Sequence, residues 1–118
     1  MSDQINTEPA TQIAALAASV QRFHDRFGQG NPASLDEMLD RIPIQDEEVR
    51  ELEQALHGEG DERAASEAAD VLFVAIGTIL RLDPELAVTA ITEVIDKNDA
   101  KTRETHYIND AGKIVRKS

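Results

Sequence analysis

At 118 residues, the chain has the length of one domain and can bury a single hydrophobic core. Its 23 acidic residues outnumber its 12 lysines and arginines, and the formal net charge of −11 argues against a nucleic-acid polymer or an anionic membrane as a partner. A nucleotide is not excluded, because a bound metal ion would reverse the sign of the local charge. The chain has no cysteine, which excludes a disulfide framework and a thiol nucleophile. Without a basic leader or a long apolar run, we expect a soluble, cytoplasmic protein.

Apolar residues recur at helical spacing along most of the chain. The periodicity and its breaks predict helices over about 11–27, 35–41, 44–57, 61–82 and 84–104. Thr11 and Ser34 are suited to cap the first two helices, and Pro43 forces a break or restart before the third. We therefore expect an all-α bundle of four to five helices, with a flexible N-terminus at 1–9, a helical domain at 10–104 and a C-terminal tail or small hairpin at 105–118.

Two blocks of acidic residues lie on the third and fourth predicted helices. The first block is Glu47, Glu48 and Glu51, and the second is Glu67 and Asp70. On a helix that turns about 100° per residue, Glu48 falls inside the apolar stripe and Glu51 falls at its edge. The stripe itself consists of Ile44, Val49, Leu52, Ala55 and Leu56. Because a solvated acidic face would lie opposite the stripe, these two glutamates are predicted to point toward the core.

The second block lies on a helix that is apolar around most of its circumference. This pattern is typical of a buried central helix, so Glu67 and Asp70 are also predicted to face the interior. Carboxylates are seldom buried unless they are paired or bind a cation, and like charges raise one another's pKa values. The basic side chains nearby are few, namely Arg50 and Arg63. The simplest resolution is a bound divalent cation. A helix this apolar in so short a chain also predicts at least a dimer.

The type of ligand indicates which cation to expect. Carboxylate oxygens favour Mg²⁺, Mn²⁺ or Ca²⁺. The sequence lacks the Asp-rich loop of an EF-hand, and none of its three histidines follows a glutamate by three residues as in di-iron bundles. Mg²⁺, or else Mn²⁺, is therefore preferred. The alternative, in which each acidic pair is ordinary solvated surface, is weakened because both pairs fall on apolar faces of adjacent helices.

The last predicted helix carries two polar residues on its apolar side. Asn98 and Lys101 fall on the side defined by Ala87, Ile91, Val94 and Ile95. An amide and an ammonium group at that place suit a site that holds phosphate and metal. Taken alone, however, the pair is better explained as an ordinary helix end, where a lysine complements the helix dipole.

Together these features resemble the MazG-like superfamily of all-α nucleotide pyrophosphohydrolases, which includes phosphoribosyl-ATP pyrophosphohydrolases and dimeric dUTPases. The superfamily carries an EExxE motif followed by ExxD, which here corresponds to Glu47, Glu48, Glu51, Glu67 and Asp70. The stretch 69–78 and the Asn98-x-x-Lys101 pair are also similar to those of family members. The resemblance covers roughly residues 20–115, and the ordered set is more specific than either acidic motif alone.

The resemblance implies a dimeric or tetrameric helical bundle that holds Mg²⁺ and hydrolyses a nucleoside triphosphate to a nucleoside monophosphate and pyrophosphate. It implies the following roles by position: metal ligands Glu48, Glu51, Glu67 and Asp70, catalytic residues Glu47 and Glu48, and substrate-binding residues Asn98 and Lys101. Glu47 would bind a further metal ion, or orient or deprotonate the attacking water. The biological role would be clearance of non-standard or surplus nucleotides, and the preferred base is open.

Two functions from other classes remain as alternatives. One is a metal-stabilised helical interaction module of the same fold that catalyses no reaction. The other is a carboxylate-bridged redox protein, which the missing Glu-x-x-His pairs disfavour. The presence of all five acidic residues favours the enzyme.

Overall fold

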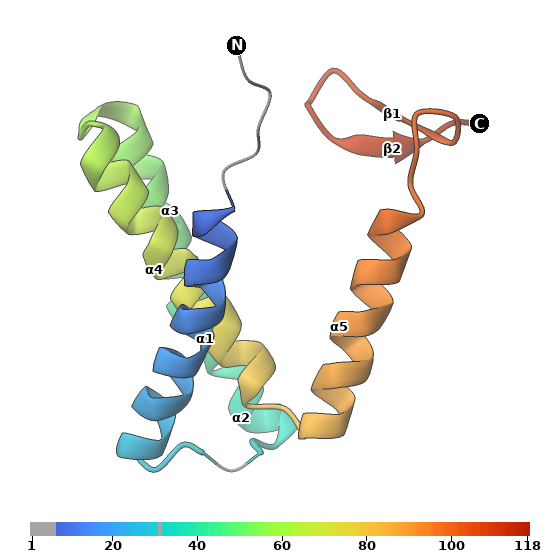
Figure 1. Cartoon of the computed structure of the whole chain (residues 1–118). Coiled ribbons are helices and arrows are strands. Elements are labelled where there is room, and N and C mark those ends of the chain that lie inside the picture. The colour runs from blue at the N-terminus through green and yellow to red at the C-terminus, as the bar shows by residue number, and fades with distance from the viewer. Residues whose placement is uncertain (1–6, 31) are drawn as a thin grey trace. The chain divides into compact units, whose positions relative to one another are not determined.

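The computed structural model describes residues 7–30 and 32–118 of the chain. These residues form five helices and two short strands, which Figure 1 shows: α1 (Glu8–Arg26), α2 (Leu35–Leu39), α3 (Arg41–Gly58), α4 (Asp61–Leu80), α5 (Pro84–Asp99), β1 (His106–Ile108) and β2 (Ile114–Arg116). The predominance of helix confirms the predicted all-α class. Each helix in the described part of the chain is too short or too polar to cross a lipid bilayer.

The chain divides into two compact units, Met1–Pro84 and Glu85–Ser118. The first unit contains α1 to α4, and the second contains α5 after its first residue together with the two strands. The predicted helical domain at 10–104 includes residues of both units. That residues 10–104 form one domain therefore stays a prediction. Residues 1–6 of the predicted flexible N-terminus lie outside the described residues.

In the first unit, α4 packs against α1 on one side and α3 on another (Figure 1). The turn between α3 and α4 is short, and it is made possible by Gly60, whose φ of 88° lies in the left-handed region. Val20 of α1 is fully buried, and the ring of Phe23 meets the ring of Phe73 edge-on at 5.4 Å between centroids. These contacts form the apolar part of a small core.

The face that α3 presents to α4 is unusually polar. Arg41 donates hydrogen bonds from Nε to Thr78 Oγ1 (2.9 Å) and from Nη2 to the carbonyl of Val74 (3.1 Å). Gln45 donates from Nε2 to the carbonyl of Val71 at 3.2 Å. Since these bonds join side chains of α3 to two backbone carbonyls and one hydroxyl of α4, they fix the rotation of α3 against α4.

The predicted apolar stripe of α3 is only partly buried. Ala55 is 1% exposed, but Ile44 and Val49 are each 47% exposed and Leu56 is 69% exposed. The prediction that the whole stripe faces the core of the chain is therefore wrong, because α3 uses the polar face around Arg41 and Gln45 to contact α4.

The prediction for α4 needs a similar correction. Its buried residues are Glu67, Val74 and Gly77, which lie on one side of the helix, whereas most of its other large apolar residues are half-buried. Among the described residues of its unit, the long helices that pack against α4 are α1 and α3. The helix is thus central in its unit but not enclosed by it.

Two of the helix boundaries that differ from the prediction have a local physical reason. α1 begins at Glu8 and not near Thr11, because Pro9 fits the first turn of a helix, where a backbone N–H has no partner. α5 ends at Asp99 and not near 104, since Thr102 and Thr105 bond to nearby backbone groups and close a separate turn. The other helices begin and end within three residues of the predicted positions, and Pro43 lies in the first turn of α3, after a break at Asp40.

The C-terminal segment forms the hairpin that was one of two predicted alternatives. The strands β1 and β2 are antiparallel, and the pairs are His106 with Arg116, Tyr107 with Val115 and Ile108 with Ile114. The side chain of Asn109 accepts hydrogen bonds from the backbone N–H groups of Ala111 and Lys113, which closes the turn.

Replacing Gly77 with alanine should destabilise the protein. A Cβ at this position would collide with the guanidinium of Arg41 and lie 3.1 Å from His24 Nε2. Because Arg41 would have to give up its two hydrogen bonds to α4, we expect a loss of about 1–3 kcal/mol in the free energy of unfolding. Urea denaturation measures the loss. Gly58→Ala is the matched control, since its Cβ would meet no atom within 4 Å. An equal effect of the two substitutions would contradict this account of the α3–α4 contact.

Candidate metal centre

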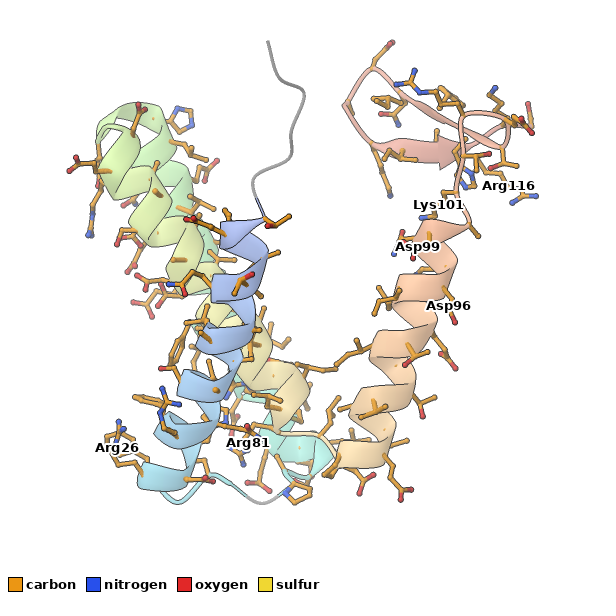
Figure 2. The ribbon with its side chains drawn as sticks, viewed as in Figure 1. Arg26, Arg81, Asp96, Asp99, Lys101 and Arg116 are labelled. Carbon is orange, nitrogen blue, oxygen red and sulfur yellow. The ribbon has the colours of Figure 1, made fainter. Side chains whose placement is uncertain are left out.

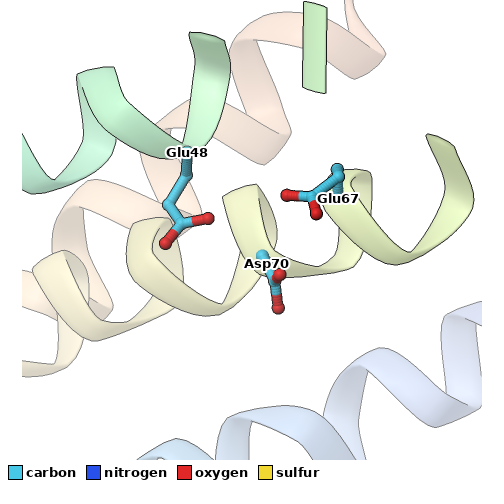
Figure 3. Close-up of side chains that lie close together, drawn as sticks. All are labelled: Glu48, Glu67 and Asp70. Carbon is cyan, nitrogen blue, oxygen red and sulfur yellow. The ribbon is translucent and has the colours of Figure 1, made fainter. Parts of the chain in front are cut away.

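Three carboxylates come together where α3 faces α4. Glu48 projects from α3, and Glu67 and Asp70 project from α4 (Figure 3). One oxygen atom from each of the three lies within 4.8 Å of the other two. The i, i+3 spacing of Glu67 and Asp70 places both on adjacent turns of α4, and the rotation of α3 set by Arg41 and Gln45 directs Glu48 toward them.

The cluster buries carboxylate oxygens that have no hydrogen-bond donor. Glu67 is 2% exposed and Glu48 is half-buried, whereas Asp70 is exposed. Oε2 of Glu48 and Oε2 of Glu67 are both buried without a hydrogen-bond partner among the described residues. Leaving a buried carboxylate oxygen without a partner is costly, so these two atoms require an explanation.

The electrostatics of the cluster disfavour negative charge. Burial raises the pKa of Glu48 above its usual value, and the charges of Asp70, Glu67 and Glu47 raise it further. Burial also raises the pKa of Glu67, although the nearby Arg63 guanidinium opposes that shift. Without a cation, the cluster is therefore a destabilising element when it is ionised.

Two other predicted site residues lie beside this cluster. Glu51 is half-buried on α3, and its carboxyl lowers the pKa of Glu48 but raises the pKa of Glu67. Glu47 is exposed, and its charge contributes to the raised pKa of Glu48. The structure thus brings all five predicted acids into one region, with Glu48, Glu67 and Asp70 converging most closely.

One basic side chain already contacts the cluster. Arg63 places Nη2 at 2.7 Å from Oε1 of Glu67 and also lies 3.4 Å from a carboxylate oxygen of Glu59. The arginine side chain is 57% exposed. It neutralises part of the charge of Glu67, but the second oxygen of Glu67 and that of Glu48 keep no partner.

The donor set fits a hard divalent cation. All the converging groups are carboxylates, and oxygen ligands are those that Mg²⁺ and Mn²⁺ take. The unpartnered oxygens of Glu48 and Glu67 come from two different helices, so an ion held by both would join α3 to α4. Glu51 and Asp70 are placed to supply further oxygen ligands.

The two predicted substrate-binding residues lie in the other unit. Asn98 is exposed on α5 and donates from Nδ2 to the carbonyl of Val94 at 2.8 Å. Lys101 follows the end of α5, so the helical face assigned to it from the sequence does not apply. Both residues line a pocket within Glu85–Ser118, together with Arg103, His106 and Lys117 among others. The sequence argument did not assign these last three residues, although the concentration of basic residues after position 100 was a usable signal.

Comparison of the chain with protein-family models, with curated proteins and with solved structures finds no match. The argument for function therefore depends on the residues of this chain and their geometry.

The buried carboxylates should make the metal-free protein less stable as pH rises. A raised folded-state pKa means that the folded protein holds its proton more tightly than the unfolded chain. The resulting stabilisation is complete at pH values below 4.5, the usual pKa of a glutamate in the unfolded chain. It is lost as pH rises through the higher pKa that Glu48 has in the folded protein. Glu48→Gln cannot ionise, so in chelator its stability relative to the parent should increase from pH 4 to pH 7. Chemical denaturation across this range measures the difference.

Glu53→Gln, at an exposed position on the same helix, provides the control for this measurement. Its stability relative to the parent should not show the same trend with pH. A pH-independent difference between Glu48→Gln and the parent would contradict the raised pKa of Glu48.

Proposed function

We propose that the protein is a Mg²⁺-dependent nucleoside triphosphate pyrophosphohydrolase, which releases pyrophosphate and a nucleoside monophosphate. The observation that carries this proposal is the pair of buried, unpartnered carboxylate oxygens on Glu48 and Glu67. Glu48, Glu67 and Asp70 converge there, and with Glu47 and Glu51 they make up the EExxE and ExxD pattern on which the resemblance to MazG-like pyrophosphohydrolases depends.

The chemistry divides among the acidic residues. Glu48, Glu51, Glu67 and Asp70 would hold the ion, which would offset the negative charge of the phosphates. Glu47 is exposed and close enough to influence the pKa of Glu48, so it would orient the attacking water or accept its proton. Asn98 and Lys101 would contact phosphate or sugar. Clearance of surplus or non-standard nucleotides in the cytoplasm would be the corresponding biological role.

The ion pair between Arg63 and Glu67 favours a second candidate, a helical interaction module without catalytic activity. In that case the arginine would balance part of the buried charge, and any bound metal would only stabilise the fold. Turnover of a nucleotide distinguishes the two candidates directly.

We also propose that the protein forms a homo-oligomer, a dimer or a tetramer. Its buried hydrophobic residues among those described are Val20, Ala55, Val74 and Ala87. Large apolar side chains are exposed on every described helix except α4, for example Ile13 at 45%, Leu39 at 67% and Leu56 at 69%. We expect part of this exposed apolar surface to be covered in contacts between copies of the chain.

The oligomer is testable by light scattering over a dilution series. We expect a mass of at least twice 13.0 kDa at micromolar protein concentration, because association removes the exposed apolar side chains from water. A particle of 13.0 kDa throughout the series would contradict the proposal.

Glu48→Gln should abolish pyrophosphate release from a nucleotide that the parent hydrolyses. Glutamine keeps the shape of the side chain but removes one negative ligand from the cluster. We expect a fall in kcat/KM of about 10³-fold, equivalent to about 4 kcal/mol of transition-state stabilisation. The measurement is pyrophosphate release from a panel of ribo- and deoxyribonucleoside triphosphates, with Mg²⁺ and with chelator.

Glu53→Gln is the matched control for this assay, since Glu53 is exposed on the same helix. It should retain the parent's activity to within about twofold. Full activity of Glu48→Gln would contradict the site assignment. No turnover by the parent on any nucleotide with Mg²⁺ would contradict the enzyme and favour the non-catalytic module.

A further inference from the structure

The second unit contains a pocket of ≈ 720 Å³ that lies wholly within Glu85–Ser118. It is formed where the chain leaves α5 and enters the hairpin. Its lining includes Lys101, Arg103, His106, Ile108, Ile114 and Lys117. Figure 2 shows Lys101 at the end of α5 and Arg116 in the adjoining hairpin.

The segment around this pocket has the opposite charge from the rest of the chain. Residues 101–118 contain two acids, Glu104 and Asp110, among the chain's 23, but five of its 12 lysines and arginines: Lys101, Arg103, Lys113, Arg116 and Lys117. The three of these that line the pocket form no ion pair with any described residue. The dipole of α5 accounts for a cation just past its end, such as Lys101, but not for Arg103 and Lys117, which lie farther along the chain.

His106 is held at this pocket in a fixed orientation. Its Nδ1 lies 2.7 Å from Oγ1 of Thr105, which leaves Nε2 as the ring nitrogen available to a ligand. The partial burial of the ring lowers the pKa of His106, and the charges of Lys101 and Arg116 lower it further. The charges that act on the histidine ring are therefore those of two cationic side chains, Lys101 and Arg116.

The hairpin register separates the pocket into a polar end and an apolar end. Successive side chains of a strand point to opposite faces, so His106 and Ile108 share one face of β1. Their partners across the hairpin are Arg116 and Ile114. One end of this face carries His106 and Arg116, and the other end carries two isoleucines, of which Ile108 is 68% exposed. All of these residues except Arg116 line the pocket, where Lys101, Arg103 and Lys117 supply the positive charge.

We infer that this pocket binds a nucleoside polyphosphate, with the phosphates at Lys101, Arg103 and Lys117 and the nucleoside against Ile108 and Ile114. Cationic side chains without protein partners suit phosphate oxygens, and apolar side chains suit the faces of a base. The inference rests on the proposed function only in treating the bound nucleotide as a substrate. The binding itself requires no metal and no turnover.

The test is isothermal titration of the full chain in chelator at low salt, with inorganic triphosphate and with nucleoside triphosphates as separate probes. Without metal the acidic cluster repels these anions, so any binding reports on other sites. The double variant Arg103→Gln/Lys117→Gln should weaken binding of both kinds of probe about tenfold or more. The matched control is Arg22→Gln/Arg26→Gln, which removes the same charge from exposed positions of α1 and should change binding less than twofold.

Ile108→Ser separates a nucleotide site from a site for bare phosphate. It should weaken binding of nucleoside triphosphates several-fold and leave inorganic triphosphate unchanged, because only the nucleoside contacts the apolar end. Equal effects of the two double variants, or no binding by the parent at millimolar probe, would overturn the inference. Unchanged binding of nucleoside triphosphates by Ile108→Ser would overturn the placement of the nucleoside.

The outcome is independent of the turnover assay. Metal-free binding that depends on Arg103 and Lys117, in a protein without turnover, would support the pocket and contradict the enzyme. If turnover depended on Glu48 but the pocket variant and its α1 control bound the phosphate probes equally well, the enzyme would be supported and the pocket contradicted.

Discussion

The contact between α3 and α4 is made largely by polar groups, and the candidate site depends on it. Arg41 and Gln45 bond to α4 at Thr78, Val74 and Val71, which sets the rotation of α3. That rotation brings Glu48 opposite Glu67 and leaves a buried oxygen of each without a donor. The like charges of Glu48 and Glu67 oppose folding when both are ionised and partly buried. A cation bound between them would remove this repulsion and stabilise the contact between α3 and α4.

Much of the acidic site could be predicted from the sequence, because helical spacing alone places Glu48 among inward-facing positions and pairs Glu67 with Asp70. The exposure of the apolar stripe of α3 could not be predicted from the sequence. Hydrophobic periodicity does not distinguish a face that is covered by the same chain from one that is available to another chain, so Val49 and Leu56 were wrongly assigned to the core. The interaction of Arg41 with α4 also has no sequence signature, because it depends on the absence of a Cβ at Gly77.

The two candidate sites have opposite charges and lie in different units of the chain. The cluster around Glu48 and Glu67 keeps two buried oxygens without a partner although Arg63 contacts Glu67, and the lining of the pocket around Arg103 and Lys117 includes no acidic residue. The pocket was missed from the sequence because α5 was extended to 104, which treated Lys101 as a helical residue and hid the turn formed by Thr102 and Thr105.

The central claim is that Glu48 and Glu67 hold a divalent cation, and anomalous diffraction from crystals grown with Mn²⁺ tests it most directly. The account predicts an anomalous peak between the carboxylates of Glu48 and Glu67, with Arg63 displaced from Glu67, and no such peak in Glu67→Gln crystals. The claim would be contradicted if, at saturating Mn²⁺, the Arg63–Glu67 ion pair stayed intact and anomalous peaks appeared only at acidic residues outside this cluster.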